Sequence, residues 1–69
     1  MDWQSVNSST LERIAYDASS MTLVVEFRSG TQYQYFGVPE YVFRELAGAS
    51  SPGHYLAEQV KRSYRYSRL

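Results

Sequence analysis

The segment Gly30-Thr31-Gln32-Tyr33-Gln34-Tyr35-Phe36-Gly37-Val38-Pro39 decides the fold of this 69-residue chain. Tyr33 and Tyr35 stand two residues apart between turn-forming residues. Because side chains alternate along a strand, both rings lie on the same face. That face either presents the rings to a ligand, as in sheets that stack bases, or buries them in the core. The hairpin that contains this segment distinguishes the two possibilities.

The hairpin begins with a strand over Thr22-Leu23-Val24-Val25-Glu26-Phe27, in which Leu23, Val25 and Phe27 alternate with the other residues. A two-residue loop would place Val25 opposite Gln34. A three-residue loop with Gly30 at a positive φ instead pairs Phe27 with Thr31, Val25 with Tyr33 and Leu23 with Tyr35. We expect the second register, because it gathers the apolar side chains on one face. The tyrosines are then part of the core, and the reverse face carries Val24 and Phe36 among polar residues.

The rest of the chain supplies an earlier strand and two helices. We expect a strand over residues 11–17 with a bulge near Leu11, and residues 3–6 are placed to add a fourth strand at the edge. One helix begins at Val38-Pro39-Glu40 and ends at Gly48. A second begins at Ser50-Ser51-Pro52 and continues to the C-terminus, with Gly53, Leu56, Ala57, Val60 and Tyr64 on its buried side.

The predicted fold is therefore α+β: a small antiparallel meander of three strands, or four with residues 3–6, followed by two α-helices packed on one sheet face. A small barrel is the architectural alternative. At this length, residues 1–69 form a single domain.

Composition narrows the setting of the protein. The chain has no cysteine and lacks both a signal peptide and an apolar stretch long enough to cross a bilayer, so we expect a cytoplasmic protein with no membrane partner. The formal net charge is zero, but residues 1–59 carry three cations and all seven acids. Residues 60–69 carry four cations and no acid, which indicates a basic contact surface.

The order of these features resembles the KTSC domain, a module found alone in bacterial proteins and at the C-terminus of some lysyl-tRNA synthetases. The resemblance covers nearly the whole chain and is most specific at the Tyr-x-Tyr of Tyr33 and Tyr35 followed by Val38-Pro39, which form its structural motif here. Further matching segments are Ile14-Ala15-Tyr16-Asp17, Gly53-x-Tyr55-Leu56 and Val60-Lys61-Arg62-Ser63-Tyr64. The chain departs from the family pattern at Ala15 and Ala57, where glycine and asparagine are expected. The resemblance implies RNA binding and no established reaction.

The inventory of reactive side chains argues against an enzyme. His54 is the only histidine, and there is no cysteine, glycine-rich phosphate loop or paired His-Glu helical motif. We expect His54 to be an exposed first-turn residue, and we expect no catalytic residue, no metal site and no cofactor.

The C-terminal region is the candidate binding site. On the expected helix, Lys61, Arg65 and Arg68 repeat at i, i+4 and i+7, while Arg62 lies beside Tyr55 and Tyr66. Cations for phosphates beside flat rings for bases are typical of RNA-binding surfaces, although cations near a helix end are also favoured by the helix dipole and by solubility. The sequence predicts a non-catalytic accessory domain, acting as a monomer, that binds single-stranded RNA or tRNA. The alternative is a protein-interaction module that uses the Val24/Phe36 sheet face or the same helix.

Overall fold

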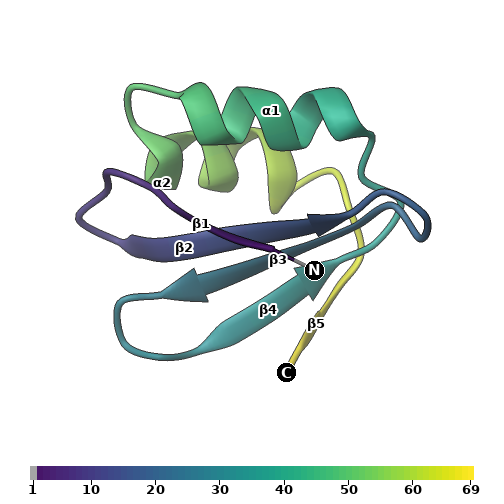
Figure 1. Ribbon diagram of the computed structural model, residues 1–69, viewed down its shortest axis with the longest axis horizontal. Helices are drawn as coiled ribbons and strands as arrows, with labels where there is room; N and C mark the ends of the chain where they lie inside the picture. Colours follow the sequence, from purple (N-terminus) through teal and green to yellow (C-terminus); the bar gives the residue numbers. More distant parts are fainter. Residues whose placement is uncertain (1) are drawn as a thin grey trace.

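The computed structural model describes residues 2–69 and shows one antiparallel sheet with helices on one side (Figure 1). The five strands are hydrogen-bonded in the order β1-β2-β3-β4-β5, and the helical segments lie between β4 and β5 in the chain. The elements are β1 (Trp3–Ser5), β2 (Leu11–Asp17), β3 (Thr22–Phe27), β4 (Gln32–Tyr35), α1 (Glu40–Gly48), α2 (Pro52–Tyr55), the π-helical turn η1 (Leu56–Val60) and β5 (Tyr66–Arg68).

The β3–β4 hairpin has the register predicted from its three-residue loop. Val25 pairs with Tyr33 and Leu23 with Tyr35. The loop is closed by the Phe27 N–H, which donates to the Thr31 carbonyl at 2.9 Å, and Gly30 has a φ of 94°. Glycine suits this position because an L side chain is strained at such a φ.

The first strands also follow the sequence prediction. The register of β2 against β3 shifts between Leu11 and Arg13, which is the expected bulge. Residues Trp3–Ser5 add the edge strand β1, with Trp3 opposite Ala15.

The helices cover the face of the sheet that carries the alternating apolar residues (Figure 1). In α1, Val42 and Leu46 are one turn apart and buried, and Glu40 lies in the first turn near the positive end of the helix. No helix within residues 2–69 is long and apolar enough to cross a bilayer. The core consists of Leu11, Ile14, Leu23, Val25, Tyr35, Val38, Val42, Leu46, Leu56 and Val60.

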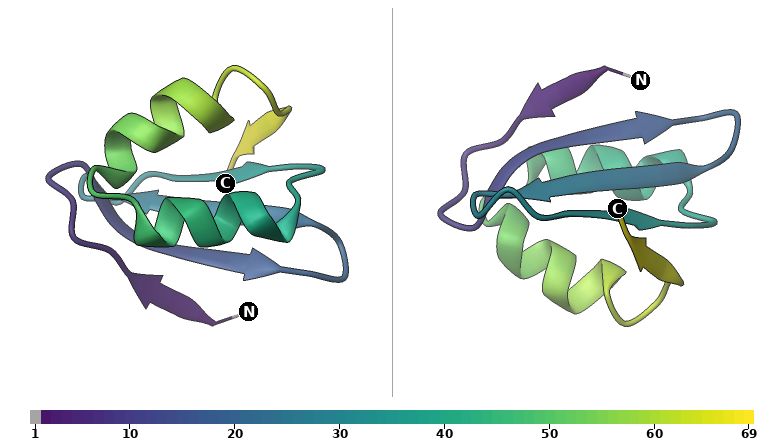
Figure 2. Two further views of the ribbon diagram at one scale, coloured as in Figure 1. Left: turned by 90° about the horizontal axis from the view of Figure 1, so that it is seen from above. Right: turned by 90° about the horizontal axis from the view of Figure 1, so that it is seen from below.

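The prediction was wrong about the C-terminal segment, which is not one helix. The second helical segment ends at Val60, and Ala57, predicted to be buried, is exposed. The Lys61 N–H bonds to the Leu56 carbonyl five residues back at 2.9 Å, so the last turn is wide, and the chain then reverses. It forms a fifth strand where three or four were expected (Figure 2).

Long-range pairing explains this difference. Without β5, β4 would be an edge strand with unpaired backbone groups along its outer side. The Leu69 N–H donates to the Gln32 carbonyl and the Phe36 N–H to the Arg65 carbonyl, each at 2.9 Å. These bonds lie at either end of the β4–β5 pair, and a helix through residue 68 would leave the same groups on β4 unsatisfied.

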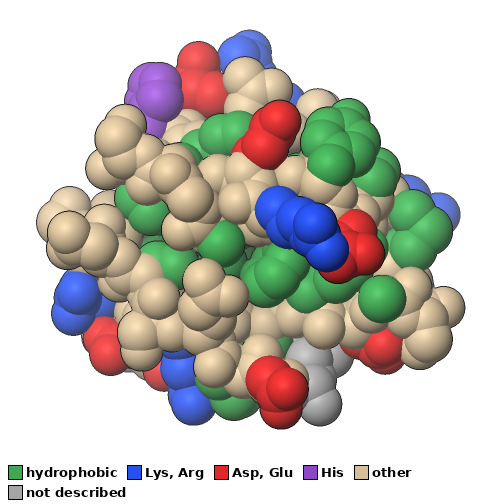
Figure 3. Space-filling model, turned by 45° about the horizontal axis from the view of Figure 1, so that its top comes forward, with side chains coloured by type: hydrophobic (Ala, Val, Ile, Leu, Met, Phe, Trp, Pro, Cys, Tyr) green, Lys and Arg blue, Asp and Glu red, His purple; other side chains and the backbone are tan. Residues whose placement is uncertain are grey.

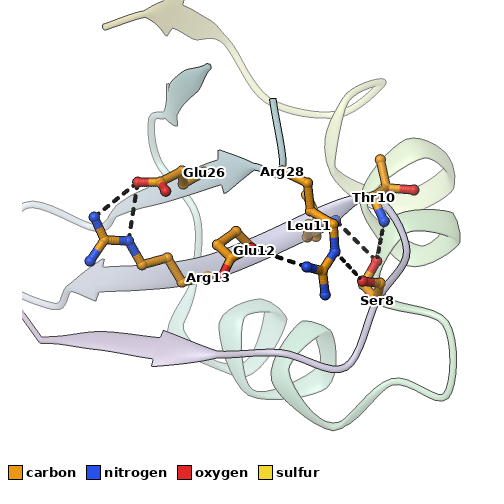
Figure 4. Close-up of polar contacts among 7 residues, drawn as sticks. All are labelled: Ser8, Thr10, Leu11, Glu12, Arg13, Glu26 and Arg28. Atoms are coloured by element: carbon orange, nitrogen blue, oxygen red, sulfur yellow. Dashed lines mark hydrogen bonds and ion pairs between the residues drawn. The ribbon is translucent and has the colours of Figure 1, made fainter. Parts of the chain in front are cut away.

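The reverse face of the sheet is not covered by a helix (Figure 2). Instead, side chains bridge across it. The Arg13 guanidinium lies 4.1 Å from the Trp3 ring centroid and forms an ion pair with Glu26 at 3.0 Å (Figure 4). The Gln32 amide donates to the same Glu26 carboxylate at 2.7 Å. Contacts therefore run from β1 to β4 across this face.

The sequence predicted an apolar reverse face that carries Val24 and Phe36, but much of the apolar surface on this face is buried. Val24 is only 6% exposed, and Ala15 is fully buried opposite Trp3. Phe36, which follows β4, remains 41% exposed. The apolar centre of this face is therefore covered by the chain itself, and the exposed apolar surface is at its margin.

The turn before β2 fixes where α2 begins. The Ser8 hydroxyl accepts hydrogen bonds from the N–H groups of Thr10 and Leu11, and its carbonyl accepts one from the Arg28 side chain at 2.8 Å (Figure 4). A Cβ atom at Gly53 would lie 3.2 Å from the Thr10 hydroxyl oxygen. The absence of a side chain at Gly53 therefore allows the start of α2 to approach this turn closely.

Candidate nucleic-acid interface

The two tyrosines of β4 differ in burial. Tyr35 is 1% exposed and belongs to the core, as predicted. Tyr33 is half-buried against the core and reaches the surface near Phe27, whose ring centroid lies 5.9 Å away in an edge-to-face arrangement. Tyr33 is thus part core and part surface.

Strand β5 brings a third tyrosine to this pair. Tyr66 lies opposite Tyr35, and its ring centroid is 5.7 Å from that of Tyr35 and 5.9 Å from that of Tyr33. Burial, together with the neighbouring Tyr66 and Tyr33, raises the pKa of the Tyr35 phenol. The rings of residues 33, 35 and 66 form an aromatic cluster that runs from the core to the surface.

A pocket of about 190 Å³ opens at this cluster and is lined by Tyr33, Tyr35, Tyr66 and Lys61. The Lys61 ammonium also lies 5.8 Å from the Phe27 ring centroid, within the range of a cation–π contact. Lys61 follows η1 directly, so the end of the helical segment places this cation beside the rings of β3 and β4. We call this pocket the tyrosine pocket.

Two further pockets border the same side of the molecule. One, of about 480 Å³, is lined by Phe27, Tyr33, Arg28 and the hydroxyl residues Ser9, Thr10, Ser29 and Thr31. The other includes Arg68, which lies opposite Tyr33 in the β4–β5 register. No Asp or Glu from residues 2–69 is among the residues that line these three pockets.

The seven cations divide into two groups by their partners. Arg13, Arg28 and Arg44 form ion pairs with Glu26, Glu12 and Glu40, respectively. Within residues 2–69, no salt bridge involves Lys61, Arg62, Arg65 or Arg68, all of which are exposed. On the helix side shown in Figure 3, cationic side chains lie beside acidic ones.

The structure brings together only some of the residues that the sequence placed in one site. Lys61, Tyr66 and Arg68 lie around Tyr33, on the turn after η1 and on β5. Arg62 lies in that turn and Arg65 just before β5, where its carbonyl accepts the Phe36 N–H. The predicted helical stripe does not exist, because residues 61–68 are a turn and a strand.

Tyr55 lies apart from this group. Its hydroxyl donates to the Glu45 carboxylate of α1 at 2.6 Å, and it borders a different pocket with His54 and Glu58. Burial, with the hydrogen bond to Glu45, raises the pKa of Tyr55 to about 12. Tyr55 joins α2 to α1 and does not stand beside Tyr66. His54 is exposed, as expected.

Val38 and Pro39, the other half of the Tyr-x-Tyr motif, connect β4 to α1. Val38 is fully buried, and its N–H donates to the Met21 carbonyl at 2.9 Å. Its carbonyl accepts a hydrogen bond from the Tyr16 hydroxyl. Pro39 is extended and directly precedes the first helical residue. The motif therefore determines how the chain leaves the sheet and enters α1.

Among residues 2–69, no group of three or more His, Cys, Asp or Glu side chains is arranged to hold a metal ion. The groups that gather at the tyrosine pocket are phenol rings and cations. Such groups bind by stacking and by charge.

Comparison with known proteins identifies the domain. A family model described as the KTSC domain matches residues 7–64. The chain belongs to the KTSC domain family. A protein of Tsukamurella paurometabola is 37% identical over 62 residues, a match that covers 90% of this chain and 92% of that protein. The crystal structure of a KTSC domain protein from Yersinia pestis matches with a TM-score of 0.93 and 31% identity, covering 99% of this chain and 96% of the other.

The KTSC domain also occurs as part of a larger enzyme. A lysine–tRNA ligase of Trichormus variabilis is 38% identical over 61 residues, which is 88% of this chain and 11% of the ligase. This chain therefore corresponds to a small accessory part of that ligase and spans about a ninth of its length.

The sequence did not predict that Tyr33 lines the tyrosine pocket or that Phe27 lines the larger pocket next to it. Both were assigned to the core, and a half-buried ring at the margin of a core has the same sequence pattern as a buried one. One feature of the sequence fits β5: Tyr64 and Tyr66 stand two residues apart, which is the period of a strand. The helical spacing of Lys61, Arg65 and Arg68 predicts a helix instead, and the structure shows that this prediction is wrong.

Proposed function

We propose that this KTSC domain is a non-catalytic accessory domain that binds RNA through the basic segment of residues 61–68. The observation that carries the proposal is that four exposed cations, Lys61, Arg62, Arg65 and Arg68, form no salt bridge within residues 2–69, and that Lys61 among them lines the tyrosine pocket. Unpaired, exposed cations are free to replace the counterions of a phosphate backbone, whereas the three arginines in ion pairs are already neutralised. The match to part of a lysine–tRNA ligase supports the proposal, because that enzyme acts on an RNA.

In this proposal the domain acts as a monomer in the cytoplasm and needs no cofactor or membrane. Its RNA partner is single-stranded RNA or tRNA. With four cations, each contributing about one phosphate contact, binding is modest and strongly salt-dependent, with log K falling by up to about 3 for each tenfold increase in salt.

The test is a fluorescence-anisotropy titration of labelled RNA at low and at physiological salt. Lys61→Ala and Arg68→Ala are expected to weaken binding. Arg44→Ala is a matched control, because it removes the same charge from an ion pair on α1 and is expected to leave affinity nearly unchanged. Absence of RNA binding at low salt would refute the proposal. So would an equal effect of all three variants, because that would indicate net charge alone.

A second candidate function is protein interaction through the margin of the reverse sheet face. Its supporting observation is the exposure of Phe36 at the end of β4, on a face that no helix covers (Figure 2). An apolar contact of this kind changes little with salt, unlike phosphate binding. The test compares the sedimentation of the wild-type protein with that of the Phe36→Ser variant, which shows whether either one self-associates or binds a partner. A wild-type protein that is strictly monomeric and retains no partner counts against it.

A further inference from the structure

One aromatic ring of the tyrosine pocket, that of Tyr66, is exposed to solvent. Tyr66 is 59% exposed, although its ring touches both tyrosines of β4. Those two rings meet it at 41° and 67°, so neither stacks flat upon it. A large part of the Tyr66 ring is therefore available to a flat group that enters the pocket.

Two cations lie near this ring. Lys61 lines the pocket itself, and Arg68 follows Tyr66 by two residues on the same face of β5. Because Arg68 lies opposite Tyr33, it also stands at the side of the pocket toward the β3–β4 loop. A ligand that rests on Tyr66 thus lies near the charges of Lys61 and Arg68, while no acidic side chain of residues 2–69 lines the pocket.

The surface continues beyond the pocket. Tyr33 lines both the tyrosine pocket and the larger pocket next to it, which is also lined by Phe27 and by residues with hydroxyl groups. Four of these hydroxyls belong to Ser9, Thr10, Ser29 and Thr31. The two pockets therefore adjoin at Tyr33, with aromatic rings lining both and hydroxyl groups lining the larger one.

We propose that the tyrosine pocket binds an unpaired base of single-stranded RNA, stacked on Tyr66, with Lys61 and Arg68 contacting the flanking phosphates. This inference deepens the proposed RNA binding and rests on it. A base within a duplex is covered by its neighbours above and below and cannot stack on a protein ring, so the ligand is single-stranded. The hydroxyl groups of the adjoining pocket are suited to the ribose 2′-OH, which favours RNA over DNA.

The experiment compares three labelled probes of one sequence: a short single-stranded RNA, the same RNA in a duplex, and single-stranded DNA. Wild-type protein is expected to bind the single-stranded RNA about tenfold more tightly than the duplex, and more tightly than the DNA. Tyr66→Leu keeps apolar cover over Tyr35 but removes the ring, and is expected to lose about tenfold in affinity. Tyr66→Phe keeps the ring and is expected to bind like the wild type.

Tyr41→Leu is the matched control. Tyr41 is a similarly exposed tyrosine, 63% against 59%, but lies on α1 away from the pocket, so its replacement is expected to leave affinity unchanged. If the wild-type protein binds none of the probes, the proposed RNA binding fails and this inference fails with it. If the single-stranded and duplex RNA bind equally and Tyr66→Leu matches the wild type while Lys61→Ala weakens binding, RNA binding stands and base stacking is refuted. Equal affinity for the DNA refutes the assignment of the hydroxyl groups to the ribose.

Discussion

The ring of Tyr66 in β5 lies 5.7 Å from that of Tyr35 in β4, and the two residues are directly opposite each other in the sheet. The inner ring is buried, and the outer ring is mostly exposed. The pair therefore divides two roles between neighbouring tyrosines: Tyr35 contributes to the core, and Tyr66 forms the surface above it. Substitutions at the two positions should accordingly differ in kind.

Tyr35→Ala is expected to destabilise the domain by about 3–5 kcal/mol, because it leaves a cavity where a fully buried ring was. A domain of this size has only ~3–5 kcal/mol of stability from its core, so this variant is expected to be largely unfolded in buffer. Tyr66→Ala is expected to cost about 1 kcal/mol, because it removes the ring contacts with Tyr33 and Tyr35 but leaves no buried cavity. Urea unfolding followed by circular dichroism measures both. Similar losses at the two positions would contradict the division of roles.

The close approach of α2 to the turn at residues 8–10 is tested at Gly53. Gly53→Val adds atoms next to the Thr10 and Ser8 side chains and is expected to destabilise by about 1–3 kcal/mol. Gly48→Ala is the control: it meets nothing within 4 Å at the end of α1, and is expected to stabilise by about 0.5–1 kcal/mol. If Gly53→Val has the same urea midpoint of unfolding as the wild type, α2 packs less closely against the turn at residues 8–10 than the structure indicates.

The hairpin and the C-terminus show what local sequence determines. The loop Arg28-Ser29-Gly30 and the alternation of Val25 with Tyr33 were sufficient to predict the β3–β4 register, because a one-residue slip would bury polar side chains. The spacing of Lys61, Arg65 and Arg68 fits a helix, whereas Tyr64, Tyr66 and Arg68 recur with the period of a strand. Pairing with the open edge of β4, which is distant in sequence, selects the strand. The sequence of residues 61–68 alone therefore does not determine that they pair with β4.

The residue types of the candidate site were predictable from the sequence, but their neighbours in space were not. The excess of cations after residue 60 is visible in the composition, and those cations form no salt bridge within residues 2–69. The partners of Lys61 and Tyr66 were not predictable, because they depend on β5 returning to the sheet beside Tyr33. A continuous helix would place Tyr55 near Tyr66, and the sequence prediction grouped them for that reason. In the structure the helical segment ends at Val60, and the two residues lie apart.

The bridge across the reverse face predicts how stability depends on pH. Hydrogen bonding to Gln32, and then to Arg13, lowers the pKa of Glu26. A carboxyl group whose pKa is lower in the folded state stabilises the fold above its unfolded pKa of about 4.3, and this contribution is lost as the pH falls through the folded pKa. Wild-type stability should therefore decrease between pH 5 and pH 2 (roughly the range of carboxyl titration).

The matching variant is Glu26→Gln, which cannot ionise. Its urea midpoint is expected to be lower than that of the wild type at neutral pH and to change less on acidification. Asp17, whose pKa is lowered by hydrogen bonds from Ser19 and Ser20, retains its own share of the acid dependence. An unchanged acid dependence in Glu26→Gln would show that the bridge does not depend on the carboxylate charge.

Tyr55 provides a prediction at alkaline pH. Its pKa is raised to about 12 by burial and by the hydrogen bond to Glu45. A phenol with a raised folded pKa stabilises the fold below its unfolded pKa of about 10, and this contribution is lost as the pH rises toward the folded pKa. In an ultraviolet absorbance titration, Tyr55→Phe should remove one of the last phenols to ionise. Loss of a phenol that titrates near pH 10 (the ordinary value) would disagree with this assignment.

The central claim, that RNA binds beside β5, is tested most directly by an NMR titration. The ¹⁵N-labelled chain of residues 1–69 is titrated at low salt with a short single-stranded RNA. We predict that the amide signals of Phe27, Tyr33, Lys61, Tyr66 and Arg68 shift, while those of α1 do not. No shift at these five residues, or shifts confined to α1 and the reverse face of the sheet, would contradict the account.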